Sequence, residues 1–120
     1  MNQSMLQSPI NMNTYRTFRA TNEAIAAAMD QICILKPEVA ILLELYEAEH
    51  SSIPIKASII GLAAGIPQTT SHRYLRYLEE CGMVFRYPHL TDQRVNFIRL
   101  APALLAKLDR IFLGDPGPSR

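Results

Sequence analysis

The stretch GIPQTTSHRYLRYLEECGMVFRYPHLTDQRVNFIRL, residues 65–100, decides the fold because it joins a helix signal directly to a hairpin signal. Gly65 can take the left-handed conformation that ends a short helix, and Pro67 forces an extended step before a second helix begins near Gln68. Two helices joined by a three-residue turn that contains glycine have the spacing of a helix-turn-helix. Beyond Gly82, MVFRYP and RVNFIRL are rich in β-branched and aromatic residues and flank the polar HLTDQ, which predicts a β-hairpin.

Helical periodicity continues towards the N-terminus. An apolar stripe predicts one helix that begins at Thr21 or Asn22 and reaches Leu35. Pro37 suits the first turn of a second helix, which carries a broader stripe and runs to about His50.

Shorter elements complete the order. The run Ile53–Ile55 is β-branched and contains a proline, which predicts a brief edge strand or an extended connector. Residues 57–64 predict a short helix, and Pro102 suits the first turn of a closing helix with a leucine-rich stripe. The predicted fold class is mainly α with a small β-hairpin, in a winged helix-turn-helix arrangement.

Composition indicates one domain between two tails. A chain of 120 residues, 48% of them hydrophobic and 19% charged, is long enough for one compact core. The polar, uncharged N-terminal stretch cannot bury enough apolar surface to offset its ordering entropy. We therefore expect a flexible tail over 1–20, a winged-helix domain with terminal dimerisation helices over 21–113, and a second flexible tail over 114–120.

The cysteines and the hydropathy pattern point to a cytoplasmic protein. Cys33 and Cys81 lie in no CxxC motif, which argues against a disulfide framework and against a zinc site. Apolar runs are too short to span a bilayer, and residues 1–8 lack the pattern of a secretory leader. We expect no membrane association.

Charge is distributed unevenly along the chain. The net charge of +1 excludes any bulk-charge argument for binding a polyanion. Residues 20–50 contain one base and six acids, whereas residues 68–99 contain five arginines against three acids. The second helix of the helix-turn-helix and the hairpin are therefore the basic side, which favours contact with nucleic acid. The alternative is that these arginines only keep the surface soluble and pair with Glu79 and Glu80.

Residues 78–100 resemble the wing of the MarR family of transcriptional regulators. Members of that family show Leu-Glu and a glycine at the end of the recognition helix, a strand, a loop with Asp-x-Arg, and a strand ending in leucine. The matching residues here are Leu78, Glu79, Gly82, Asp92, Arg94 and Leu100. With the helical segments KPEVAILLELYEAEH and GIPQTTSHRYLRYLEE, the resemblance covers about residues 36–112. It implies a homodimer that binds double-stranded DNA.

Residue chemistry assigns expected roles within this basic side. In the major groove, glutamine can pair with adenine, arginine with guanine, and threonine methyl groups can meet thymine. Asp92, by accepting hydrogen bonds from Arg94, would hold that guanidinium at the wing tip for the minor groove. Arg86 and Arg99 would contact phosphates. The predicted DNA-contacting residues are Gln68, Thr69, Thr70, His72, Arg73, Arg76, Arg86, Asp92 and Arg94. A solvated His72 and a purely turn-shaping Asp92–Arg94 pair are the alternatives.

The terminal helices carry more apolar surface than one small core needs, which predicts a dimer interface. Its predicted residues are Ile25, Met29, Ile32, Leu105, Leu108 and Phe112. The sequence contains no catalytic triad pattern, phosphate-binding glycine loop or metal-ligand spacing, so we expect no enzyme activity, metal or cofactor. We expect DNA binding without a small-molecule effector, because the terminal helices are short for this family. The competing hypothesis is a winged-helix module that docks a partner protein.

Overall fold

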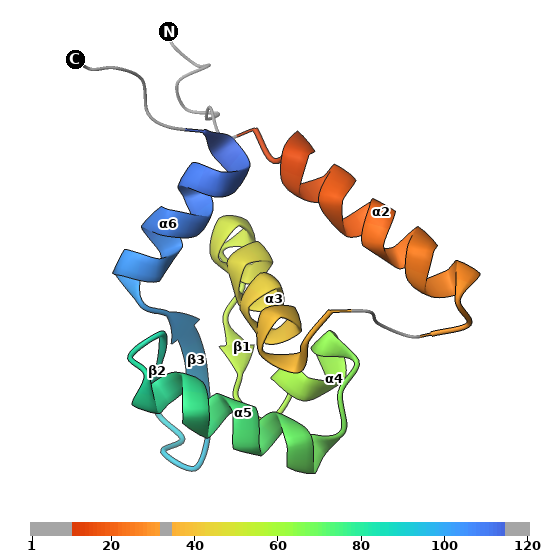
Figure 1. Ribbon diagram of the computed structural model, residues 1–120. Coiled ribbons are helices and arrows are strands. Elements are labelled where there is room, and N and C mark those ends of the chain that lie inside the picture. Colours follow the sequence, from red (N-terminus) through yellow and green to blue (C-terminus); the bar gives the residue numbers. More distant parts are fainter. Residues whose placement is uncertain (1–10, 32–34, 115–120) are drawn as a thin grey trace, which may run out of the picture. The chain divides into compact units, whose positions relative to one another are not determined.

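The computed structural model describes residues 11–31 and 35–114. Its elements are α2 (Asn13–Ala28), α3 (Pro37–Ser51), β1 (Ile55–Lys56), α4 (Ile60–Ala64), α5 (Gln68–Glu80), β2 (Val84–Pro88), β3 (Asn96–Leu100) and α6 (Pro102–Leu113) (Figure 1). The chain divides into two compact units. The larger unit is Leu35–Leu105, and the smaller contains α2 and most of α6. Within the described ranges, no helix has the length and apolar character needed to cross a membrane.

α3 is the central helix of the larger unit, as Figure 1 shows. Its apolar side chains are spread around the helix axis, and Ile41, Leu45 and Tyr46 are all buried. A helix that is hydrophobic over most of its circumference is stable in water only when other elements surround it. α3 accordingly contacts α4, α5 and β3. It begins at Pro37, as predicted from the sequence, and ends at Ser51.

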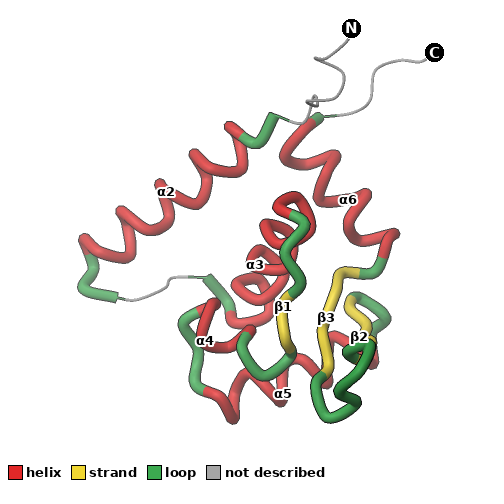
Figure 2. The backbone as a smooth tube through the Cα atoms, turned by 180° about the vertical axis from the view of Figure 1, so that it is seen from behind, coloured by secondary structure: helices red, strands yellow, loops and turns green. Residues whose placement is uncertain are grey.

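The three strands form one antiparallel sheet in the order β1-β3-β2 (Figure 2). Val84 pairs with Leu100, and Ile55 pairs with Ile98. Because paired residues of antiparallel strands point to the same side, Val84, Ile98 and Leu100 share the buried face. The predicted hairpin and edge strand are confirmed, although the edge strand includes Lys56 and begins at Ile55.

The turn between α4 and α5 is the helix-turn-helix predicted from the sequence. Gly65 ends α4 with φ 75°, in the left-handed region that glycine adopts without steric cost. The two helices approach closely where Gly61 of α4 meets Ser71 of α5. A Cβ atom added at Gly61 would lie 2.5 Å from the Cβ atom of Ser71. The absence of a side chain at Gly61 therefore permits this helix crossing.

α2 begins much earlier than the sequence predicted. Residues 13–20, expected to belong to a flexible tail, form the first half of this helix. Phe112 of α6 packs against two aromatic residues of this segment. Its ring centroid lies 5.2 Å from that of Tyr15 and 5.7 Å from that of Phe18. Such aromatic pairs add to the stabilisation from buried area, and no local sequence pattern indicates that Phe112 is the residue that meets them. The predicted end was also wrong, because α2 stops at Ala28.

α6 begins at Pro102, as predicted, and ends at Leu113. Gly114 follows with φ 86°, a conformation that suits a helix end. No residue of α6 is buried, although its sequence is strongly apolar. The remainder of the predicted C-terminal tail, 115–120, lies outside the described residues.

Replacing Gly61 by alanine should destabilise the protein. The new methyl group would displace Ser71, and overpacking of this kind costs about 1–3 kcal/mol. Urea unfolding at equilibrium measures the loss. Leu62→Ala on the same helix is the matched control, because Leu62 is 77% exposed and its truncation should change the free energy of unfolding by at most about 0.5 kcal/mol. A Gly61→Ala protein as stable as wild type would contradict the close approach.

Candidate nucleic-acid interface

α5 has one buried face and one polar face. Ser71, Leu75 and Leu78 are buried at helical spacing, and α5 contacts α3, α4 and β2. This packing fixes the rotation of the helix about its axis. The polar face turned to solvent contains Gln68, Thr69, His72, Arg73 and Arg76, with Thr70 half-buried beside them.

Arg73 and Arg76 are the unpaired cations of this face. Both are exposed, and neither forms an ion pair with any residue that the structure describes. Each guanidinium therefore keeps its planar set of N–H donors available to a ligand. The alternative that the arginines of residues 68–99 pair with Glu79 and Glu80 therefore does not describe Arg73 and Arg76, although Arg86 does pair with Glu79.

Gln68 is partly engaged within the protein. Its Nε2 donates to the carbonyl oxygen of Ser58, at 3.3 Å, and lies 3.3 Å from Nε2 of His72. These contacts tie the first turn of α5 to the segment before α4. Gln68 and His72 thus form one connected pair, whereas the sequence indicated two independent contacts.

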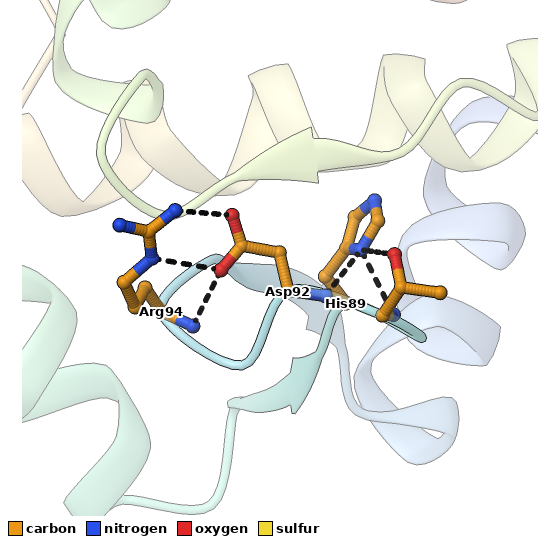
Figure 3. Close-up of polar contacts among 4 residues, drawn as sticks. His89, Asp92 and Arg94 are labelled. Atoms are coloured by element: carbon orange, nitrogen blue, oxygen red, sulfur yellow. Dashed lines mark hydrogen bonds and ion pairs between the residues drawn. The ribbon is translucent and has the colours of Figure 1, made fainter.

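Asp92 and Arg94 form the predicted pair in the loop between β2 and β3 (Figure 3). The Nε and Nη2 atoms of Arg94 donate to the two carboxylate oxygens of Asp92 at 3.0 and 3.1 Å, and the Arg94 backbone N–H donates to Oδ1 at 3.1 Å. The guanidinium is held although the Arg94 side chain is 89% exposed. These bonds from Arg94 lower the pKa of Asp92, so the pair persists at neutral pH and is lost only as pH falls below the ordinary carboxyl range.

His89 organises the same loop, a role that the sequence analysis missed. Its Nδ1 accepts hydrogen bonds from the backbone N–H groups of Thr91, at 3.2 Å, and Asp92, at 3.1 Å (Figure 3). The signal was present, because a side-chain acceptor placed two or three residues before free N–H groups is the pattern of an Asx-turn. Aspartate and asparagine usually supply that acceptor, and here an imidazole does.

A basic hollow lies between α5, the end of β1 and the loop. Its volume is about 220 Å³, and its basic lining residues are Lys56, His72, Arg86 and Arg94. Arg86 also pairs with Glu79 of α5, at 2.8 Å. Lys56 was missed because only the pairing of β1 with β3 brings it beside the loop. The hollow joins the polar face of α5 to the Asp92–Arg94 pair in one surface, defined here as the basic surface.

Arg99 does not belong to the basic surface. It forms an ion pair with Glu49 of α3, which raises the pKa of the guanidinium. The residue stands opposite Phe85, on the face of the sheet away from Val84 and Leu100. Arg86 and Arg99 thus lie on opposite faces of the sheet, and phosphate contact by either of them stays a prediction.

Most of the residues predicted to form a dimer interface lie on α2, at its C-terminal end, or on α6. Ile25 and Met29 are 45% and 58% exposed at the end of α2. The α6 residues Leu105, Leu108 and Phe112 are half-buried. Ile32 lies outside the described residues. Among the residues described, no group of three or more potential ligands is placed to hold a metal ion.

Solved structures share this architecture. The DNA-bound structure of reduced AbfR is 24% identical over 85% of this chain and 70% of its own, with a TM-score of 0.53. The chain has a winged helix-turn-helix fold. A MepR mutant from a multidrug-resistant S. aureus isolate is 22% identical over 89% of this chain and 78% of its own, with a TM-score of 0.56. A probable transcriptional regulator from Pseudomonas aeruginosa is 21% identical over 81% and 70%, with a TM-score of 0.55. No protein-family model and no curated protein matches the chain.

The winged-helix fold assigns names to the parts of the basic surface. α5 is the second helix of the helix-turn-helix, and β2, β3 and the loop between them are the wing. The fold predicted from the sequence is confirmed, and the wing pair Asp92–Arg94 has the geometry that the sequence predicted.

Removing the Asp92 carboxylate should release the wing-tip guanidinium without unfolding the protein. In Asp92→Ala the Arg94 backbone N–H and side chain lose their acceptor, so their NMR signals should shift towards those of a solvated loop. The thermal midpoint should stay at the wild-type value, because an exposed pair adds little stability. Gln93→Ala, at the exposed position between the two, is the control and should leave the Arg94 signals in place. Unchanged Arg94 signals in Asp92→Ala would contradict the tether.

Proposed function

We propose that this chain is a MarR-type transcriptional regulator that binds duplex DNA sequence-specifically as a homodimer in the cytoplasm. The observation that carries the proposal is the basic surface. It combines two unpaired arginines on the recognition helix, a carboxylate-held arginine at the wing tip, and a basic hollow between them. The neighbours AbfR and MepR have been solved bound to DNA, which supports the same ligand here.

Each part of the basic surface suits a different feature of B-DNA. The recognition helix α5 presents Arg73 in its N-terminal half, the part that reads base edges in the major groove. Arg94 would enter the minor groove, where narrow A·T-rich stretches have a strong negative potential. The hollow between them, with Lys56 and Arg86, has the charge and position to receive a backbone phosphate. Thr69, Thr70, His72 and Arg76 would complete the contacts from the helix.

A second copy of the chain is the proposed cover for the terminal helices. α6 is apolar yet has no buried residue, and Ile25, Met29 and Ile111 are each at least 45% exposed. Exposed apolar patches on helices commonly mark protein interfaces. A two-fold dimer would place two recognition helices about 34–36 Å apart, one turn of DNA, and would select a pseudo-palindromic site.

Arg73 and Arg94 should differ in what their loss does to DNA binding. Arg73→Ala should cost about 1–3 kcal/mol on the preferred site and relax the preference at one base position, because its fork can satisfy two acceptors of one guanine. Arg94→Ala should weaken binding to all duplexes and reduce the preference for A·T-rich flanks. Affinities are measured on a site selected from random duplexes, a scrambled site and sites with altered flanks, at two salt concentrations.

Lys56→Ala is the matched control for a phosphate contact. It should weaken binding to every duplex equally and should lower the salt dependence of the affinity. If Arg73→Ala also loses the same affinity on every duplex, Arg73 does not read a base. No DNA affinity at moderate salt for the wild-type protein would favour the module that docks a partner protein.

Ile111→Glu should convert the dimer into a monomer. Ile111 is 67% exposed on α6, so a charge there disrupts an interface without disturbing the fold. Light scattering at micromolar concentration measures the change. Lys107→Glu, an exposed charge reversal on the same helix, is the control and should remain dimeric. A wild-type protein that is monomeric under these conditions and still binds DNA with full affinity would contradict the dimer.

A further inference from the structure

We propose that His89 is a positioning residue of the wing: its neutral imidazole holds the loop in the shape that presents Arg94 to DNA, and its protonation releases that shape. The inference rests on the proposed function for its DNA readout. Its structural readout, on the free protein, does not depend on DNA binding.

The first argument is the convergence of two donors on one acceptor. The backbone N–H groups of Thr91 and Asp92 both point to Nδ1 of His89, at 3.2 and 3.1 Å, and Oγ1 of Thr91 lies 3.3 Å from the same atom. A neutral imidazole has one acceptor nitrogen, so this arrangement requires the tautomer that carries its proton on Nε2. An imidazolium has a proton on both nitrogens and cannot accept either bond.

The second argument is that the strands fix the ring independently of the loop. The His89 backbone N–H donates to the carbonyl oxygen of Val95 at 2.9 Å, which closes the base of the loop. The imidazole stacks on Phe97, with ring centroids 5.7 Å apart and an interplanar angle of 28°. Phe97 in turn packs against Tyr87, at 5.4 Å. Nδ1 is thus a fixed point to which the loop backbone attaches.

The third argument is the connection from this fixed point to the DNA-facing cation. His89 holds the Asp92 backbone, and the Asp92 side chain holds both the backbone N–H and the guanidinium of Arg94. The Asp92 carbonyl oxygen also accepts a hydrogen bond from the Val95 N–H at 3.0 Å, so loss of the His89 contact loosens the Asp92 backbone on its N–H side, next to the side chain that holds Arg94. His89 acts through Asp92 and needs no DNA contact of its own.

The charged groups around His89 determine how protonation acts. Asp92 is the charged group next to His89 within the loop, and Arg94 and, from β1, Lys56 are the cations that act on Asp92. The hydrogen bonds from Arg94, together with the charge of Lys56, keep the pKa of Asp92 low, so this carboxylate stays ionised between pH 5 and 8, where histidines ordinarily change charge. A protonated His89 would lose both N–H bonds and compete with Arg94 for the same carboxylate.

The test compares His89→Asn with His89→Ala on the selected DNA site between pH 5.5 and pH 8. The asparagine side-chain oxygen can accept the same loop N–H groups and does not titrate, whereas alanine offers no acceptor. At pH 8, His89→Asn should bind like wild type, and His89→Ala should bind about fivefold more weakly, as expected for loss of about one net hydrogen bond.

On acidification the DNA affinity of the wild-type protein, divided by that of His89→Asn, should fall. It should approach the ratio that His89→Ala shows to His89→Asn. The asparagine variant retains every other titratable side chain of the protein, so the ratio of the two affinities isolates the effect of His89. A ratio that stays constant across this pH range, or equal binding by all three proteins at pH 8, would overturn the inference.

Amide NMR of the free proteins separates this inference from the proposed function. The Thr91 and Asp92 amide signals should move in His89→Ala and, for wild type, on acidification, while those of His89→Asn stay constant. If wild type binds no DNA, the proposed function fails and these amide signals alone decide the role of His89. Signals that do not respond to His89→Ala would overturn it.

Discussion

The close packing of Ser71 against Gly61 is the constraint on which the interface depends. It sets the crossing of α4 and α5, and with Leu75 and Leu78 it turns one face of α5 into the core. The opposite face must then present its polar residues to solvent, because a helix is rigid and its side chains are spaced by a fixed angle. The direction of Arg73 is therefore a consequence of core packing rather than of any contact that Arg73 makes.

The wing achieves order by a different means. Its loop is exposed, and the Asp92–Arg94 pair contributes little to the stability of the fold because water screens it. The pair and the His89 bonds instead reduce the number of shapes available to an exposed segment. Holding Arg94 in one geometry before binding lowers the entropy cost of using it at an interface. Positional order and thermodynamic stability are thus supplied by separate parts of the molecule.

Sequence patterns predicted the larger unit well because its signals are local. Pro37 begins a helix, Gly65 ends one, and the alternation that leads to Leu100 marks a strand. The same reasoning failed for residues 13–20, whose polar composition suggested a tail. The helix there is accompanied by packing of Tyr15 on Phe112, a pair separated by most of the chain, and no local pattern reports such a partner.

The sequence by itself determined the order of elements, the polar face of α5, and the Asp92–Arg94 pair, since each depends on neighbours within a few residues. Only the tertiary structure decided which charges act together. The pairing of β1 with β3 places Lys56 beside the wing, and Arg99 pairs with Glu49 of α3, outside the basic surface. These outcomes depend on the register of the sheet and on the packing of α3, and neither is encoded in the spacing of the residues concerned.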